Sequence, residues 1–276
     1  MSAYTDAELE ELDQNAGAIG RSRPESRQEG AMNLDPRLVS LVAPASYEAE
    51  HYRTLRLRIE SKPDGKPLQI IAVTSAGIGE GKTTTAINLA GALAQSREAR
   101  VLLVDADLRR PCVGIQLGLD DSRGAGLADA ILDPGRALES VILRRLPLNL
   151  GIVTAGKLPP APYETLQSSR LGTLFEEARR LFDYVVVDTP PLLPVPDCRL
   201  IARWVDGILM VVAADRTPRK LVEEGLNLLE PGKVLGLVFN GERRPPAGYY
   251  GYYHSYGHSS RPPGRGSQQT ARHSSR

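Results

Sequence analysis

The sequence has few of the features that mark a secreted, membrane-spanning or nucleic-acid-binding protein. Cys112 and Cys198 are the only cysteines in 276 residues, too few for a disulfide framework and typical of a reducing compartment. No uninterrupted apolar run approaches the roughly 20 residues that span a bilayer, and the acidic N-terminus MSAYTDAELEELDQNAG has no apolar signal core. The 34 basic and 33 acidic side chains nearly cancel, so the net charge of +1 does not indicate a nucleic-acid partner. These absences predict a cytoplasmic protein.

Aromatic residues are also scarce, and many of them gather near the end of the chain. Ten of the 14 aromatics are tyrosines, and five of these ten lie within residues 249–256. Six arginines and one glutamate give residues 241–276 a charge of +5, which leaves −4 for the rest of the chain. Residues 1–36 and 243–276 lack apolar periodicity. They are predicted to be disordered, as an acidic N-terminal extension and a Tyr/Arg-rich tail respectively.

Between these segments, over residues 37–242, short apolar runs alternate with helical patterns. The runs show no polar alternation, which is typical of strands buried on both faces. They are Leu68–Thr74, Val101–Val104, Tyr184–Val187, Gly207–Ala213 and Val234–Phe239. Helices are predicted at Glu48–Glu60, Lys82–Ser96, Tyr163–Leu181, Cys198–Trp204 and Arg219–Leu229. The alternation predicts a doubly wound α/β domain with a mostly parallel sheet.

One strand-to-helix connection carries the strongest motif, IIAVTSAGIGEGKTTTAINLAGALA at residues 70–94. Its glycine-rich turn directs several backbone N–H groups and the positive end of a helix at one point. Lys82 would reach the β- and γ-phosphates of a nucleotide, and the Thr83 hydroxyl would bind Mg²⁺. An ordinary tight turn is the alternative, and Ala76 stands where the strict motif has glycine, but the GKT sequence favours a phosphate-binding loop. The residues expected to contact ATP are Gly77, Gly79, Glu80, Gly81, Lys82, Thr83 and Thr84.

Two other apolar strands end in carboxylates. VLLVDADLRRP (101–111) carries Asp105 and Asp107, and YVVVDTPP (184–191) carries Asp188. Ligands of open α/β sheets bind outside the carboxyl ends of the strands, and side chains two residues apart on extended backbone point to the same side. A single aspartate at such a place is more often a helix cap or a turn residue. Three of them beside a phosphate loop favour a site that contains a base and Mg²⁺ ligands.

Together, the three motifs resemble those of the bacterial protein-tyrosine kinases (BY-kinases), P-loop enzymes tied to capsule and exopolysaccharide export. The resemblance covers roughly residues 40–242 and includes GKLPPAPYETLQS at 156–168. It implies a P-loop NTPase fold, ATP and Mg²⁺ as cofactors, and Asp105 as the base for the tyrosine hydroxyl. The catalytic set it implies is Lys82, Asp105, Asp107 and Asp188, with Thr83, Asp107 and Asp188 around Mg²⁺. Arg109 completes the pattern D-x-D-x-R, and Asn240 is either an adenine contact or a turn residue.

A charged pattern upstream of the loop also matches this family. Glu50, Arg53 and Arg56 have the spacing E-x-x-R-x-x-R, which in BY-kinases lies on an oligomerisation helix that helps to close a ring. Residues i, i+3 and i+6 share one helix face, so they would be able to pair with a neighbouring subunit. The alternative is a row of intrahelical salt bridges, each worth only a few tenths of a kcal/mol.

The resemblance also assigns a role to the tail. Its tyrosines would be the autophosphorylation sites, namely Tyr249, Tyr250, Tyr252, Tyr253 and Tyr256. The implied partners are further copies of the chain, a transmembrane polysaccharide co-polymerase that activates the kinase, and a tyrosine phosphatase. The chain would then be peripheral at the inner face of the membrane. A MinD/ParA-like ATPase switch is the alternative function, but Gly77 stands where those proteins usually have a signature lysine.

Overall fold

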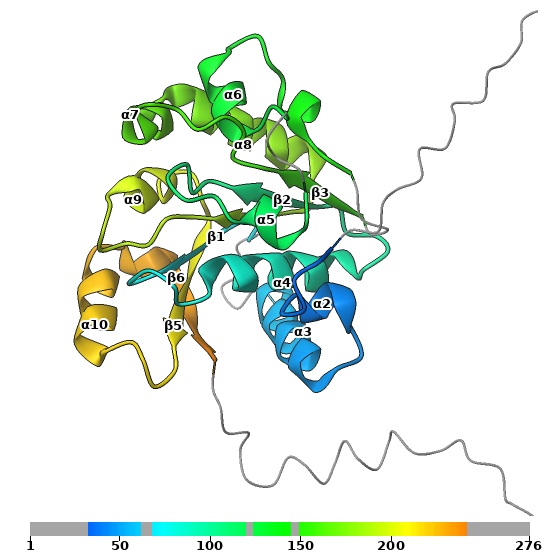
Figure 1. The fold of residues 1–276 in the computed structure, drawn as a ribbon, viewed down its shortest axis with the longest axis vertical. Coiled ribbons are helices and arrows are strands. Elements are labelled where there is room, and N and C mark those ends of the chain that lie inside the picture. Colours follow the sequence, from blue (N-terminus) through cyan, green and yellow to red (C-terminus); the bar gives the residue numbers. More distant parts are fainter. Residues whose placement is uncertain (1–32, 62–67, 120–123, 145–148, 242–276) are drawn as a thin grey trace, which may run out of the picture. The chain divides into compact units, whose positions relative to one another are not determined.

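The chain folds around a six-stranded sheet whose neighbouring strands all run parallel (Figure 1). This computed structural model describes residues 33–61, 68–119, 124–144 and 149–241. The strands are β1 (Ile70–Ser75), β2 (Val101–Asp105), β3 (Leu150–Val153), β4 (Tyr184–Asp188), β5 (Gly207–Ala213) and β6 (Val234–Asn240). Their order across the sheet is β3-β2-β4-β1-β5-β6. The predicted doubly wound α/β fold is confirmed.

Helices cover both faces of this sheet. They are α2 (Val39–Val42), α3 (Tyr47–Glu60), α4 (Lys82–Ala94), α5 (Val113–Gln116), α6 (Leu127–Leu132), α7 (Pro162–Gln167), α8 (Ser169–Leu181), α9 (Asp197–Ile201) and α10 (Arg219–Asn227), with 3₁₀ turns at Leu138–Val141 and Pro231–Lys233. Helix α4 crosses one face with α3 and α2 packed outside it, and α6, α7 and α8 lie over the other face (Figure 1). Because α4 has the sheet on one side and two helices on the other, it is buried almost all round, which explains its nearly continuous apolar sequence.

The core is divided by the sheet into two layers. Ile70 and Ala72 of β1 belong to one apolar cluster with Leu171 and Phe175 of α8. Ile71, which lies between the two β1 residues, is also fully buried but faces α4. Successive side chains of a strand point to opposite faces, so burial on both faces accounts for the unbroken apolar runs of β1, β2 and β5. The prediction is wrong for β6, whose side chains alternate between part-buried and exposed.

Several elements differ from the sequence-based expectation. The short helices α2, α5 and α6 were not predicted, and α9 ends at Ile201 and not at Trp204. Strand β3 was not predicted, because four residues that include Gly151 are too short for a periodic pattern. The predicted helix Tyr163–Leu181 is divided into α7 and α8 at Ser168, whose backbone is extended (φ −58°, ψ 135°). The Ser168 hydroxyl accepts a hydrogen bond from the N–H of Arg170, so this serine caps α8 instead of continuing one long helix.

Strand β6 lies at one edge of the sheet and exposes apolar side chains. Leu235, Leu237 and Phe239 are exposed on β6, which has a neighbour on one side only. None of the described helices combines the length and apolar composition of a membrane span. The predicted N-terminal extension and the tail lie almost wholly outside the described residues.

The order of the strands along the chain indicates where a ligand would bind at the sheet. From β1 the chain passes through α4 to β2 on one side, and from β4 it crosses to β5 on the other side of β1. Such a reversal of direction leaves a crevice at the carboxyl ends of the central strands, where ligands of doubly wound folds bind. The phosphate loop and the carboxylate strands β2 and β4 all end at this edge.

Candidate active site

The loop between β1 and α4 depends on glycine at two positions. Gly79 and Gly81 have φ values of +77° and +94°, in the left-handed region that favours glycine. Gly81 is also crowded, since a Cβ there would lie 1.9 Å from Nδ2 of Asn240. Asn240 ends β6 and its Nδ2 donates to the Glu80 carbonyl at 2.9 Å. The structure therefore places Asn240 against the loop, where it fixes the backbone at the start of α4.

The side chain of Glu80 folds back into the same loop. Its Oε1 accepts a hydrogen bond from the N–H of Gly77 at 3.1 Å, and its Oε2 is buried without a hydrogen-bond partner among the described residues. Ile78 is 62% exposed, whereas Ala76 is fully buried. The Glu80 side chain thus hydrogen-bonds the backbone on the inner side of the loop, whereas the apolar side chain of Ile78 faces solvent.

The first turn of α4 brings the lysine and threonine of the motif to the carboxylate strands. Lys82 Nζ lies 2.9 Å from Asp107 Oδ2 and 3.8 Å from Asp188 Oδ1. The Thr83 hydroxyl donates to Asp188 Oδ2 at 2.7 Å. Thr84 points elsewhere and donates to Gln116 Oε1 of α5 at 2.9 Å. Two strands and one helix start therefore converge on one buried polar cluster.

Asp105 is oriented by backbone donors. Its Oδ1 accepts from the N–H of Asp107 at 3.1 Å, and its Oδ2 accepts from Cys112 and Val113 at 3.1 and 3.0 Å. Three of the roughly four lone-pair positions of a carboxylate are thus occupied. The carboxylate shapes the turn after β2 and keeps one acceptor position.

Burial and mutual repulsion perturb the titration of this cluster. Burial raises the pKa of Asp105 to about 8, and the nearby charge of Asp188 adds to the shift. Burial also raises the pKa of Asp188 to about 6, although Lys82 and the Thr83 hydroxyl oppose the shift. Burial alone would lower the pKa of Lys82, but the Asp188 and Asp107 carboxylates outweigh it and raise this pKa. One lysine faces three carboxylates, so the cluster favours additional positive charge.

Arg109 makes a contact that sequence reasoning missed. Its guanidinium forms a bidentate ion pair with the fully buried Asp197. Nε donates to Oδ2 at 2.7 Å, and Nη2 donates to Oδ1 at 3.1 Å. Pro196 occupies the N-cap position of α9, and Asp197 is the first residue of the helix. The partners are 88 residues apart, so no local signal could have revealed the pair.

The charged row on α3 is paired within the chain. Arg53 forms an ion pair with Glu50 and donates to the Pro44 carbonyl at 2.5 Å. Arg56 pairs with Glu60 at 2.8 Å and donates to the Ala92 carbonyl of α4 at 3.0 Å. Glu50 and Arg53 are about one-third exposed and remain accessible to a partner, whereas Arg56 is tied to the core helix. The five tail tyrosines lie outside the described residues.

Comparison with known proteins fits this geometry. A family profile described as an AAA domain matches residues 68–215, from β1 through β5. The tyrosine-protein kinase YwqD of Bacillus subtilis is 33% identical over 229 residues, which is 82% of this chain and 95% of YwqD. The chain belongs to the bacterial tyrosine-protein kinases. The kinase domain of the Escherichia coli tyrosine kinase ETK shares its fold with a TM-score of 0.70 and 30% identity, over 76% of this chain and 82% of that domain. The succinoglycan biosynthesis transport protein ExoP of Rhizobium meliloti is 35% identical over 228 residues, 78% of this chain but 28% of ExoP.

Proposed function

We propose that this tyrosine kinase transfers the γ-phosphoryl group of ATP to the tyrosines of its own tail and thereby regulates the synthesis and export of a capsule or exopolysaccharide. The observation that carries the proposal is the convergence of Lys82, Thr83, Asp107 and Asp188 at the mouth of the glycine loop. Phosphoryl transfer depends mainly on positioning and charge neutralisation, and this cluster supplies a cation, a hydroxyl and carboxylates within one buried space.

The nucleotide would be held by the loop and the start of α4. Gly77, Gly79 and Gly81 would present the loop backbone to phosphate oxygens. Gly79 leaves it open, since a Cβ there would meet nothing within 4 Å, and the positive end of α4 favours the phosphate charge. Lys82 would leave its contact with Asp107 and neutralise the β- and γ-phosphates. Glu80 would have to release the Gly77 N–H for phosphate, so ATP binding competes with the contact that closes the loop.

The cluster also fits Mg²⁺. Asp188 Oδ1 is buried without a hydrogen-bond partner among the described residues, and the Thr83 hydroxyl lies beside its other oxygen. No three His, Cys, Asp or Glu side chains of the described part converge as a closed metal cage. Mg²⁺ commonly takes only one or two carboxylates, with phosphate oxygens and water as its other ligands. Thr83, Asp107 and Asp188 would thus hold the ion, which supplies charge neutralisation for the phosphoryl group.

Asp105 is the proposed base for the incoming tyrosine. A free tyrosine has a pKa near 10, so its hydroxyl needs an acceptor for the proton. The raised pKa of Asp105 suits that transfer, and one acceptor position of its carboxylate remains after the three backbone contacts. Arg109 would contribute indirectly, because its pair with Asp197 fixes the turn that follows Asp107.

The substrates would be Tyr249, Tyr250, Tyr252, Tyr253 and Tyr256. A tail that begins at the end of β6 starts beside the loop, since Asn240 contacts Glu80. Transfer between neighbouring subunits of a ring is proposed, with Glu50 and Arg53 of α3 at the subunit contact and Arg56 supporting the helix. Each phosphate adds about −1.5 to −2 charge, enough for a few of them to reverse the tail's charge of +5.

The polysaccharide role and the membrane partner rest on the relatives. ExoP is named for succinoglycan biosynthesis and transport, and this chain matches 28% of its length. We infer a separate transmembrane co-polymerase as activator, a tyrosine phosphatase that resets the tail, and a peripheral location at the inner face of the membrane.

A mixing experiment tests tail phosphorylation between subunits. The full-length Lys82→Met chain, which carries the tail but no catalytic lysine, is incubated with Mg·ATP and a chain truncated before Tyr249. Phosphotyrosine on the Lys82→Met chain, mapped by mass spectrometry, is the expected result. Phosphate that appears only when the lysine and the tail belong to the same chain would contradict transfer between subunits. ATP hydrolysis without tail phosphate would favour the ATPase switch.

A further inference from the structure

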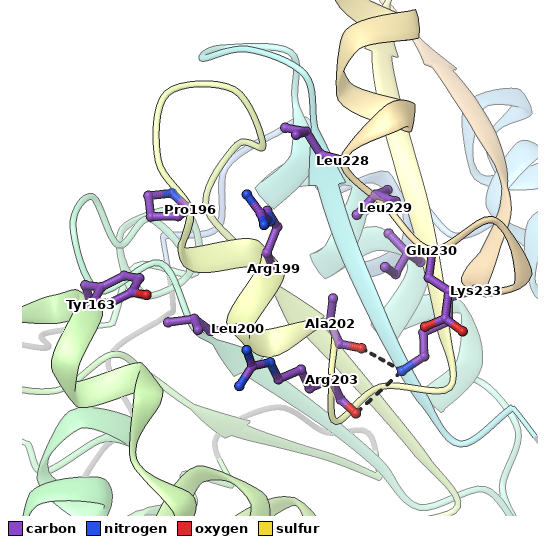
Figure 2. A pocket seen from close by; sticks show the side chains of 11 residues that line it. Tyr163, Pro196, Arg199, Leu200, Ala202, Arg203, Leu228, Leu229, Glu230 and Lys233 are labelled. Carbon is purple, nitrogen blue, oxygen red and sulfur yellow. Dashed lines mark hydrogen bonds between the residues drawn. The ribbon is translucent and has the colours of Figure 1, made fainter.

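A second pocket lies beside α9, outside the nucleotide site (Figure 2). Its volume is about 360 Å³, and it is bounded by α7, α9 and the connection from α10 to β6. Its floor includes Leu200, Ile208 and Leu229, all buried. The floor reaches the beginning of β5, and Lys233 on its wall immediately precedes β6. The pocket therefore extends to the amino ends of the strands, whereas the phosphate loop is at their carboxyl ends.

The wall of this pocket carries an excess of positive charge. Arg199 lies on α9 and Arg203 in the turn that follows the helix, and neither guanidinium has a hydrogen bond or ion pair within the described part of the chain. Lys233 Nζ donates to the carbonyls of Ala202 and Arg203 at 2.8 and 3.5 Å, as Figure 2 shows. Glu230 is the acidic residue of the lining, so the charged side chains leave a net charge of +2.

The apolar floor and the basic wall of the pocket together indicate the chemical class of its ligand. Arginine binds phosphate through two parallel N–H donors and also stacks on aromatic rings. An apolar floor below two unpaired guanidinium groups fits a ligand that has an aromatic body and a phosphate end.

We propose that this pocket binds a phosphotyrosine of the chain's own tail, residues 249–256. The inference rests on the proposed function, because it takes the tail phosphotyrosine as the enzyme's product. Unphosphorylated, residues 241–276 carry +5 and are repelled by the basic wall. The negative charge of a phosphate would be attracted to the basic wall, so the tail would bind the pocket only after phosphorylation.

The tail is long enough to reach the pocket of the same chain. Strand β6 has seven residues between the pocket and the start of the tail, a length of about 23 Å. The eight residue-to-residue steps from Gly241 to Tyr249 extend to at most about 29 Å, and the fifteen steps from Gly241 to Tyr256 to at most about 54 Å. All five tyrosines are thus within reach, and a bound phosphotyrosine would hold the tail at the end of the sheet away from the catalytic cluster.

A peptide titration tests this proposal without relying on the enzyme's own activity. A fluorescent synthetic peptide of residues 247–258, phosphorylated at Tyr252 and Tyr253, is titrated with the full-length chain after phosphatase treatment, without nucleotide and with EDTA. We expect saturable binding in fluorescence anisotropy and at least tenfold weaker binding of the unphosphorylated peptide. Phenyl phosphate should compete better than inorganic phosphate, because the floor is apolar.

Matched variants locate the binding site. Arg199→Gln with Arg203→Gln should weaken phosphopeptide binding at least tenfold. Arg219→Gln with Lys220→Gln removes the same charge from the exposed start of α10 and should change binding less than twofold. Equal loss in both pairs, loss in neither, or displacement of the peptide by Mg·ADP would overturn the proposal. If tail autophosphorylation were absent but the peptide bound as expected, the pocket would stand and the proposed source of phosphotyrosine would fail.

Discussion

The charges at the nucleotide edge and those on the outer surfaces of α3 and α9 are of similar types but in opposite environments. Asp105 and Asp188 are fully buried, and burial is the main cause that raises the pKa of each, with smaller contributions from neighbours in the same cluster. Glu50, Arg53 and Arg199 are partly or largely exposed. Buried charges interact strongly and must be compensated inside the fold, whereas exposed ones contribute little to stability and remain available to partners. Burial, more than residue type, separates the residues proposed for chemistry from those proposed for subunit contact.

Removal of the buried lysine should have the largest effect. Lys82→Met should lower phosphotyrosine formation at least ~10³-fold, because the phosphates lose their main cation. The measurement is the initial rate of phosphotyrosine formation with Mg·ATP. Lys220→Met, on an 84% exposed lysine of α10, is the control and should keep the wild-type rate. A comparable loss in both variants would remove Lys82 from the mechanism.

The hydroxyl beside Asp188 should have the next largest effect. Thr83→Val should lower the rate by about 10²-fold and shift the Mg²⁺ dependence to higher concentration, since one expected ligand of the ion is lost. Thr83→Ser retains the hydroxyl and should stay within about threefold of the wild type. If serine did not rescue the rate, packing and not metal binding would explain the valine effect.

A stability comparison between a part-buried and an exposed pair sharpens this contrast, since the side chains of Asp206 and Arg179 are each 24% exposed. Asp206 accepts hydrogen bonds from Arg179 and from the N–H groups of Gln69 and Ile70. Burial would raise the pKa of Asp206, but these donors outweigh it and lower the pKa. Asp206→Asn should reduce the free energy of unfolding by about 2 kcal/mol at pH 7.

This loss should depend on pH in a defined direction. A lowered carboxyl pKa gives stability that is complete above the unfolded-state pKa near 3.9, and that disappears as the pH falls through the folded-state value. Urea unfolding at several pH values should therefore show the variant and the wild type converging below about pH 4. The control Asp183→Asn breaks an exposed pair with Arg100 and should cost less than about 0.5 kcal/mol. Similar costs for the two pairs would contradict the role given to burial.

The smallest effect on stability is expected on α3. Glu50→Ala with Arg53→Ala should change the free energy of unfolding by less than about 0.5 kcal/mol but lower the mass measured by light scattering. Arg219→Ala with Glu223→Ala removes a comparable exposed pair from α10 and should leave the mass unchanged. An unaltered oligomer in the α3 variant would remove this helix from the assembly.

Local pattern explains which parts of the molecule were predictable. The loop, its lysine and the strand-end carboxylates are encoded in short contiguous motifs, so the cluster of Lys82 with Asp107 and Asp188 followed from sequence. The pair of Arg109 with Asp197 and the pocket around Arg199 did not, because they are made by residues brought together only by tertiary packing. Strand β3 escaped because its four residues give no period to detect.

Phosphosite mapping of the wild-type chain tests the central claim most directly. The purified full-length protein is incubated with Mg·ATP and its transmembrane activator, and phosphotyrosine is assigned by mass spectrometry. The account predicts phosphate on tyrosines within residues 249–256, and none when Lys82→Met replaces the wild type. A wild-type chain that hydrolyses ATP under these conditions while its tail stays unmodified would contradict it.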